Sequence, residues 1–221
     1  VMTASFFANT DQANLQLASF YPGAMAHAAD LRLADLPFRP DLVVISPDDP
    51  AAMRNRIHEC VESGIPYLYD PSQQLARVSV EDIHQGIEGA KMIVVNDYEA
   101  HIIEDRTRLT EADLVLGGKT LIITRGKEGA TIYADNQRFD IPVFPEVVIV
   151  DPTGTGDAFR GGFLRGLAAG LGWELCGKMG ALSATYCLEK KGTQNHSYTI
   201  GEYIERFREV FDDGGALDVL K

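Results

Sequence analysis

Short apolar runs alternate with amphipathic segments along most of the chain. Apolar runs bounded by turn residues are typical of strands in a parallel sheet, whereas apolar residues at helical spacing indicate helices. The pattern predicts strands at residues 41–46, 66–69, 91–95, 120–124, 130–134, 138–141 and 146–150, the last three as parts of a meander. It predicts helices at residues 50–63, 80–89, 97–106, 156–170, 173–190 and 200–211. Strands that alternate with helices favour an α/β fold, in which helices flank a mostly parallel sheet.

The first 21 residues follow a different pattern. Residues 3–10 and 14–21 are rich in Phe, Thr, Ser and Ala, and the polar segment Asp11, Gln12 and Ala13 lies between them. Two such runs around a short polar segment predict a β-hairpin. Pro22 and Gly23 then end the pattern, so the α/β part is expected to begin after them.

Composition and charge narrow the classes of partner. The chain has 221 residues, with 45% hydrophobic and 24% charged residues, which is ordinary for a globular protein of one large domain or two small ones. Its net charge of −12 argues against binding to nucleic acid or to an anionic membrane surface, because phosphate groups select basic surfaces. A small phosphorylated ligand is still compatible with this charge, since backbone N–H groups can bind it.

The three cysteines, Cys60, Cys176 and Cys187, contain no C-x-x-C pair and therefore indicate no zinc site or dithiol motif. Their low, odd number favours a cytoplasmic location, where thiols stay reduced. Cys176 and Cys187 lie within one predicted helix at a spacing of about three turns, so we expect both to face the core. No apolar run is long enough to cross a membrane.

Polar clusters follow three of the predicted strands. Residues 96–99 follow one strand, residues 125–129 follow the next, and residues 151–157 follow the last strand of the meander. Ligands of open α/β sheets bind beside the carboxyl ends of the strands, so we expect the three clusters to share one edge of the sheet.

The third cluster carries the strongest chemical signal. Pro152, Gly154 and Gly156 predict a tight turn into a helix, whose first N–H groups and positive dipole end suit an anion. Asp157 stands at this turn, where it could accept the proton of a substrate hydroxyl during phosphoryl transfer. The alternative is an ordinary capping or first-turn acid. The neighbouring glycines at 161 and 162 favour function slightly, because they imply the close approach of another backbone.

The other two clusters each have a plain structural alternative. Asn96 and Glu99 could hold hydrated Mg²⁺ beside nucleotide phosphates, but the same pair could simply cap a helix. Thr124, Gly126 and Gly129 could form a turn close to a nucleotide, or only a hairpin turn. Taken alone, either pattern favours the structural alternative.

Together, the three motifs resemble the ribokinase family of PfkB-type carbohydrate kinases. Residues 150–170, VDPTGTGDAFRGGFLRGLAAG, are similar to the C-terminal signature of that family. Residues 96–99 resemble its N-x-x-E motif, and residues 124–129 resemble its T-x-G-x-x-G motif. Residues 20–25, 159–163 and 191–196 are most similar to the bacterial adenosine kinase branch of the family.

The resemblance implies a role for each motif residue and an ATP-dependent reaction. It implies that Asp157 is the catalytic base and that the N–H groups of Gly154, Thr155 and Gly156 form an anion hole for the transferred phosphate. It places Asn96 and Glu99 near Mg²⁺, with Glu99 acting through water, and it places Thr124, Gly126 and Gly129 at the nucleotide. Arg160 would contact phosphate, and Asp151 with the carbonyl of Thr153 would bind a monovalent cation such as K⁺.

The resemblance also implies an organisation and a substrate class. Residues 1–22 would be strands of a small β lid that supports a homodimer, and residues 23–221 would form the nucleotide-binding and catalytic domain. The family's N-terminal segment, with its G-G-x-x-x-N-type motif, is not found before Val1, and we expect it in a longer chain. The expected activity is phosphorylation of a nucleoside or sugar hydroxyl, with the adenosine 5′-hydroxyl preferred. The alternatives are a ribokinase-type sugar kinase and, if the chain is a true fragment, a non-catalytic nucleotide-binding protein.

Overall fold

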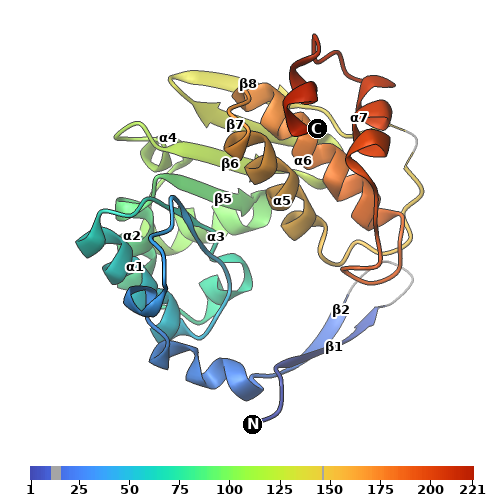
Figure 1. Ribbon diagram of the computed structural model, residues 1–221. Helices are drawn as coiled ribbons and strands as arrows, with labels where there is room; N and C mark the ends of the chain where they lie inside the picture. The colour runs from blue at the N-terminus through green and yellow to red at the C-terminus, as the bar shows by residue number, and fades with distance from the viewer. Residues whose placement is uncertain (11–15, 146) are drawn as a thin grey trace. The chain divides into compact units, whose positions relative to one another are not determined.

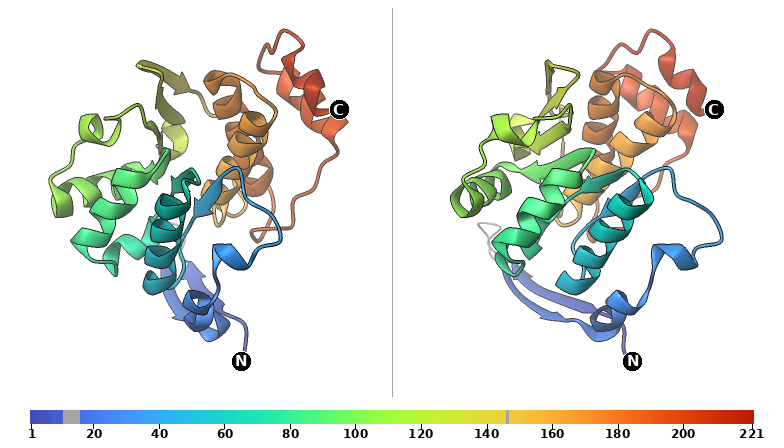
Figure 2. Two further views of the ribbon diagram at one scale, coloured as in Figure 1. Left: turned by 60° about the vertical axis from the view of Figure 1, so that its left-hand side comes forward. Right: turned by 90° about the vertical axis from the view of Figure 1, so that its left-hand side faces the viewer.

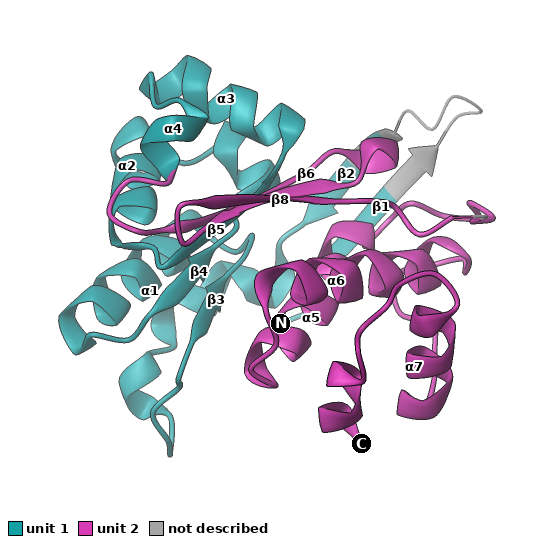
Figure 3. Ribbon diagram, turned by 90° about the horizontal axis from the view of Figure 1, so that it is seen from above, with its two compact units in different colours: residues 1–114 teal, residues 115–221 magenta. Residues whose placement is uncertain are grey.

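The computed structural model describes residues 1–10, 16–145 and 147–221. The chain divides into two compact units, residues 1–114 and residues 115–221, which Figure 3 distinguishes by colour. Each unit has its own secondary structure and buried residues. The predicted boundary after residue 22 lies inside the first unit and stays a prediction.

Unit 1 begins with the predicted hairpin. Strands β1 (Ser5–Thr10) and β2 (Gln16–Tyr21) are antiparallel, with Phe6 opposite Phe20, and they form a two-stranded ribbon of their own (Figures 1 and 2). The predicted turn at residues 11–13 lies outside the described residues. Gly23 has a φ of +50°, and a Cβ there would lie 2.4 Å from the carbonyl oxygen of Met2, so the end of the hairpin requires glycine.

Three parallel strands form the centre of unit 1. β3 (Val43–Ile45) pairs with β4 (Tyr67–Tyr69), and β4 pairs with β5 (Met92–Asn96). The apolar runs predicted these three strands and their parallel arrangement. The helices that connect them, α1 (Pro50–Ser63) and α2 (Val80–Gly89), match the predicted ranges and lie on one side of these strands (Figure 3). The described part of the chain also contains the short helices η1 (Gly23–Asp30), η2 (Leu33–Asp35), η3 (Ser72–Ala76) and α4 (Glu111–Leu114), which the pattern did not predict.

Local signals explain where the connecting helices begin and end. The Asp49 carboxylate accepts hydrogen bonds from the first amides of α1, and Gly64 ends that helix with a φ of +61°. α2 packs so closely on β4 that position 86 requires glycine, because a Cβ there would lie 2.5 Å from the ring of Tyr69. The Tyr67 hydroxyl donates to the Gly86 carbonyl at 2.9 Å, which satisfies a buried polar group.

Unit 2 begins with an antiparallel meander. Strands β6 (Thr120–Thr124), β7 (Ala130–Ala134) and β8 (Gln137–Ile141) pair in sequence order, and the short helix η4 (Gly126–Glu128) joins the first two. The prediction of a further strand at 146–150 is wrong, because the described residues 147–150 form no strand. Val148 and Ile149 are 69% and 66% exposed, and the amide of Val150 donates to Leu188, so this run pairs with a helix end instead of a strand.

Two long helices and a shorter one complete unit 2. α5 (Thr155–Ala168) packs closely against α6 (Trp173–Leu188). α6 also covers β7 and β8. At position 177 of α6 only glycine fits, because a Cβ there would lie within 2.7 Å of the side chains of Ile132 and Ile141. α7 (Ile200–Arg208) and η5 (Ala216–Leu220) join a core that includes Met179 and Phe207. Cys176 and Cys187 are both fully buried on α6, as expected. Among the described residues, none of the helices is long and apolar enough to cross a membrane.

Candidate functional site

The turn before α5 is held by Asp151. One carboxylate oxygen accepts the amide of Thr153 at 2.9 Å, and the other accepts the amide of Gly192 at 2.9 Å. These two hydrogen bonds hold the pKa of Asp151 below its ordinary value. The side chain therefore connects residues 151–153 to a segment 41 positions later in the chain.

Two glycines leave open space around the start of α5. Gly154 is the N-cap residue, with a φ of +84°, and a Cβ there would lie 3.0 Å from the Thr193 side chain. A Cβ on Gly156 would meet nothing within 4 Å among the described residues. The Thr155 hydroxyl and amide both turn back to the Pro152 carbonyl, at 2.7 and 3.3 Å. A helix leaves its first amides without intrahelical acceptors, so the start of α5 can receive an anion.

Asp157 lies in this first turn and pairs with Arg160. Its Oδ1 is 2.5 Å from Nη2 of Arg160, which lies one turn further along α5. Crowding by protein atoms raises the pKa of Asp157, although its side chain is 75% exposed, and the adjacent guanidinium acts in the opposite direction. Gly154, not Asp157, is the N-cap residue, so Asp157 is a first-turn acid whose carboxylate faces a cation.

Of the two consecutive glycines Gly161 and Gly162, only the second is explained by packing within the protein. A Cβ on Gly162 would lie 2.6 Å from the Met179 carbonyl and 2.3 Å from the Ser183 hydroxyl, whereas one on Gly161 would meet nothing within 4 Å. The expected close approach of another backbone is therefore real at Gly162. It is the packing of α6 on α5, and it provides no independent support for a ligand.

Asn96 and Glu99 of unit 1 form the helix cap that was the structural alternative. Asn96 Oδ1 accepts the Glu99 amide and Glu99 Oε2 accepts the Asn96 amide, both at 2.8 Å, at the start of α3 (Asp97–Thr107). Burial raises the pKa of Glu99, while hydrogen bonds from Asn96 and Ser72 act against that rise. A capping role accounts for this geometry and does not prevent Glu99 from also acting through water.

A polar group after β4 was not predicted from the sequence. Asp70 is 7% exposed, Ser72 has an unusual φ of +41°, and Gln74 is 4% exposed. The Gln74 amide donates to the Asp48 carbonyl at 2.7 Å, while its buried oxygen has no partner among the described residues. The segment Asp-Pro-Ser directly after a predicted strand was the available signal, and the same rule that selected residues 96–99 would have selected it.

The turn after β6 contains the third predicted motif. Thr124 ends β6, and the Arg125 amide donates to the Gly129 carbonyl at 2.7 Å across the turn. A Cβ on Gly129 would lie 2.0 Å from the Ile141 carbonyl, so this glycine is required by the neighbouring chain. Gly126 has a φ of +54° and faces open space. The hairpin alternative therefore explains Gly129, and Gly126 is the residue with room for a ligand.

The side chains at the candidate site fit a metal ion that keeps most of its water ligands better than one that is bound entirely by protein ligands. Among the described residues, no group of three or more His, Cys, Asp or Glu side chains could hold a metal ion. Mg²⁺ is commonly bound through one or two carboxylates, waters and substrate phosphates, and Glu99 can supply one such carboxylate. Asn96 and Glu99 belong to unit 1 and the other predicted site residues to unit 2, so the shared edge stays a prediction.

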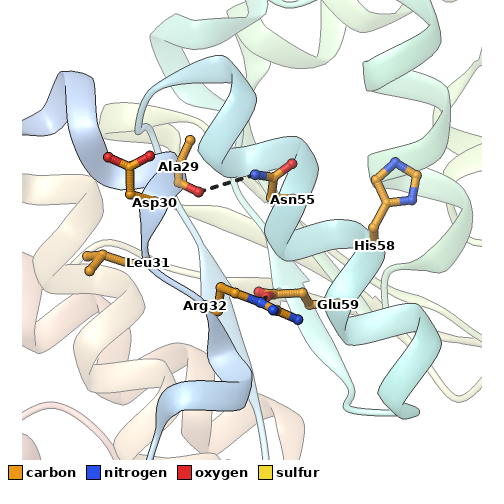
Figure 4. Close-up of a pocket in the computed structure, with 7 residues that line it drawn as sticks. All are labelled: Ala29, Asp30, Leu31, Arg32, Asn55, His58 and Glu59. Carbon is orange, nitrogen blue, oxygen red and sulfur yellow. Dashed lines mark hydrogen bonds and ion pairs between the residues drawn. The ribbon is translucent and has the colours of Figure 1, made fainter.

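Unit 1 also has a shallow pocket of about 260 Å³, which Figure 4 shows. Its polar groups largely contact each other: Asn55 donates to the Ala29 carbonyl at 3.4 Å, and Arg32 lies 3.6 Å from Glu59. None of the predicted site residues is among those around it, which are Ala29, Asp30, Leu31, Arg32, Asn55, His58 and Glu59. The pocket therefore gives no separate indication of function.

Known proteins resemble the chain over most of its length. The nucleoside kinase of Methanocaldococcus jannaschii is 29% identical over 197 residues, which are 89% of this chain and 64% of that protein. The nucleoside kinase of Methanothermobacter thermautotrophicus is 30% identical over 208 residues, which are 93% of this chain and 66% of that protein. The chain thus spans about two thirds of the length of these curated relatives.

Solved structures share the fold. The Burkholderia thailandensis nucleoside kinase in complex with inosine has a TM-score of 0.90 and 33% identity, and the match covers 95% of this chain and 70% of that one. Ribokinase from Thermotoga maritima, at 20% identity, has a TM-score of 0.78 over 93% of this chain and 70% of that one, a likeness of fold alone. These matches confirm the predicted α/β class. The profile of the pfkB family carbohydrate kinases matches residues 3–200, and the protein belongs to that family.

Proposed function

We propose that the protein transfers the γ-phosphoryl group of ATP to a hydroxyl group of a nucleoside. The observation that carries this proposal is the glycine turn at the start of α5, with the Asp157 carboxylate in its first helical turn. Membership of the pfkB family and the similarity to nucleoside kinases support it. The helix start suits a phosphoryl group and the carboxylate suits a hydroxyl proton, and phosphoryl transfer needs both.

Asp157 would act as the general base. It would accept the proton of the substrate hydroxyl while the amides of Gly154, Thr155 and Gly156 bind the γ-phosphate. The Thr155 hydroxyl donates to the Pro152 carbonyl at 2.7 Å, and the Thr155 amide contacts the same oxygen at 3.3 Å, so this amide would exchange that longer contact for the anion. Catalysis would then consist mainly of positioning and of charge stabilisation by groups that are already oriented.

The remaining predicted residues would bind the nucleotide and its ions. Asn96 and Glu99 would hold Mg²⁺ through water, and the bound ion would neutralise charge on the phosphates. Thr124, Gly126 and Gly129 would lie against the nucleotide. Asp151, kept ionised by its two amide bonds, would bind a monovalent cation together with the Thr153 carbonyl. The predicted phosphate contact of Arg160 stays a prediction.

The acceptor is proposed first as a nucleoside and, more narrowly, as adenosine at its 5′-hydroxyl. The nucleoside class is favoured because the two curated relatives described above are named nucleoside kinases and the Burkholderia enzyme was solved with inosine. A relative named cytidine kinase, 30% identical over 154 residues, keeps the choice of base open. The sugar-kinase alternative is supported by the family as a whole. A homodimer through the hairpin stays a prediction, and the exposed side chains of Phe7 and Leu17 favour it.

Asp157→Asn tests the proposal. The purified protein is incubated with ATP, Mg²⁺ and adenosine, inosine, cytidine or ribose, and the phosphorylated product is identified by chromatography and mass. We expect nucleoside-dependent turnover, a loss of about 10²- to 10⁴-fold in Asp157→Asn, and nearly unchanged ATP binding by calorimetry. Glu205→Gln, an exposed acid on α7, is the matched control and should keep full activity. Ribose as the preferred acceptor would favour the sugar-kinase alternative, and full activity of Asp157→Asn would exclude the proposed mechanism.

A further inference from the structure

The ion pair between Asp157 and Arg160 is asymmetric. The Arg160 side chain is 11% exposed, whereas the Asp157 side chain is 75% exposed, although the two are joined at 2.5 Å. A guanidinium in such surroundings has few accessible orientations, since neighbouring atoms limit its rotamers. Burial also lowers the pKa of Arg160, but a guanidinium stays charged near neutral pH. The largely buried arginine is therefore the fixed member of the pair, and the exposed carboxylate is the member that it orients.

We propose that Arg160 is a positioning residue, which holds Oδ1 of Asp157 so that Oδ2 faces the acceptor hydroxyl. This inference rests on the proposed function, in which Asp157 is the base, and it assigns Arg160 a role different from phosphate binding. The geometry supports it in two ways. The residues are three apart on α5, where side chains share a face, and the contact with Arg160 is made through Oδ1 of Asp157.

The proton and electron balance of the step leaves Arg160 unchanged. The acceptor oxygen forms a bond to the γ-phosphorus as its proton moves to Oδ2 of Asp157. The bond between the γ-phosphorus and the oxygen that bridges to the β-phosphate breaks, and ADP leaves with the electron pair. Arg160 keeps its proton throughout, and it contributes orientation and charge. Small displacements of a reacting group are costly, so a loosened carboxylate should slow the reaction.

Arg160 also favours the ionised form of Asp157, which is the form that can accept a proton. The Cys187 thiol on α6 is a second titratable group that interacts with this carboxylate, and its own pKa is raised by burial and by the charges of Asp151 and Asp157. A neutral thiol does not replace the guanidinium. Removal of Arg160 should therefore raise the pKa of Asp157, and the rise should be small because this carboxylate is largely exposed to solvent.

Three variants separate positioning from phosphate binding. Arg160→Met removes the cation, Arg160→Lys keeps a charge with different geometry, and Arg165→Met is the control at an exposed arginine on the same helix. For Arg160→Met we expect kcat to fall about ten- to a hundredfold with an unchanged KM for ATP, and the acid limb of the pH profile to move upward. Arg160→Lys should restore part of kcat and move the acid limb of the pH profile back to that of the unmodified protein. Arg165→Met should match the unmodified protein in both measurements.

A direct titration of Asp157 makes the test independent of turnover. The ¹³C resonance of its carboxyl carbon, assigned by comparison with Asp157→Asn, is followed against pH in each variant. An upward shift of the midpoint in Arg160→Met but not in Arg165→Met supports the inference, even if no acceptor is phosphorylated. An unchanged midpoint overturns it, as does a raised KM for ATP with unchanged kcat, which indicates phosphate binding by Arg160. Full activity of Asp157→Asn would instead refute the proposed function.

Discussion

The contact between α5 and α6 should respond very differently to two adjacent glycine substitutions. Gly161 and Gly162 are consecutive residues in the same helix, and alanine at either position gains about 1 kcal/mol of helix propensity over glycine. Their surroundings differ, because only Gly162 faces α6. The comparison of the two alanine variants therefore cancels the helix contribution and leaves the packing contribution.

The structure sets the size of the packing contribution. A Cβ on Gly162 would lie 2.6 Å from the Met179 carbonyl oxygen, which is backbone and can move only with α6. It would also lie 2.3 Å from the Ser183 hydroxyl, which contacts the Tyr203 hydroxyl at 3.2 Å inside the core. Overpacking of this kind costs about 1–3 kcal/mol. We expect Gly162→Ala to be less stable than Gly161→Ala by that amount, with Gly161→Ala more stable than the unmodified protein.

Urea unfolding followed by circular dichroism measures the difference. Each kcal/mol should also change the thermal midpoint by about 2–4 °C in a protein of this size. The comparison requires equal m-values, so that the midpoints report stability alone. Equal midpoints for the two variants, or a higher midpoint for Gly162→Ala, would show that the helices separate without cost and that the reasoning from backbone contact is wrong.

Two further predictions concern carboxylates outside the ion pair. Asp151 has a lowered pKa, so it stabilises the folded state above its unfolded pKa of about 3.9, and that stability is lost as the pH falls through the folded pKa. Asp151→Asn should therefore flatten the dependence of stability on pH below about pH 4, which acid titrations of thermal unfolding would detect as a smaller slope. Glu99→Gln should raise the Mg²⁺ concentration needed for half-maximal turnover, whereas Asp82→Asn, which disturbs the comparable capping box of α2, should leave that concentration unchanged. Equal effects of these two variants would show that Glu99 acts only as a cap.

Local physical chemistry made much of the fold readable in the sequence. The start of α1 follows from a capping aspartate and a proline, and its end follows from Gly64, since these signals depend on neighbouring residues alone. The ranges of α2, β6 and β7 were predicted correctly for the same reason. The motif residues of the candidate site were also selected from the sequence, because glycine turns and acids after strands have a recognisable spacing.

The errors lie where distant parts of the chain decide the outcome. Val148 and Ile149 have the composition of a strand, but their segment is bonded to the end of α6. Gly162 suggested a ligand because the sequence cannot show which backbone approaches a glycine. The packed helix that does so is known only from the structure.

The order of residues along the chain specified the class of fold, most helix and strand ranges and the candidate site residues. How those residues are held depends on the folded chain. The folded chain provides the bond from Asp151 to Gly192, the contact of Gly154 with Thr193 and the pairing of Asp157 with Arg160. Helix caps and turns arise from interactions between residues a few positions apart, which the order of the chain reveals. Burial, close approach and the pairing of charges depend on which surfaces meet after folding, and local order does not specify those surfaces.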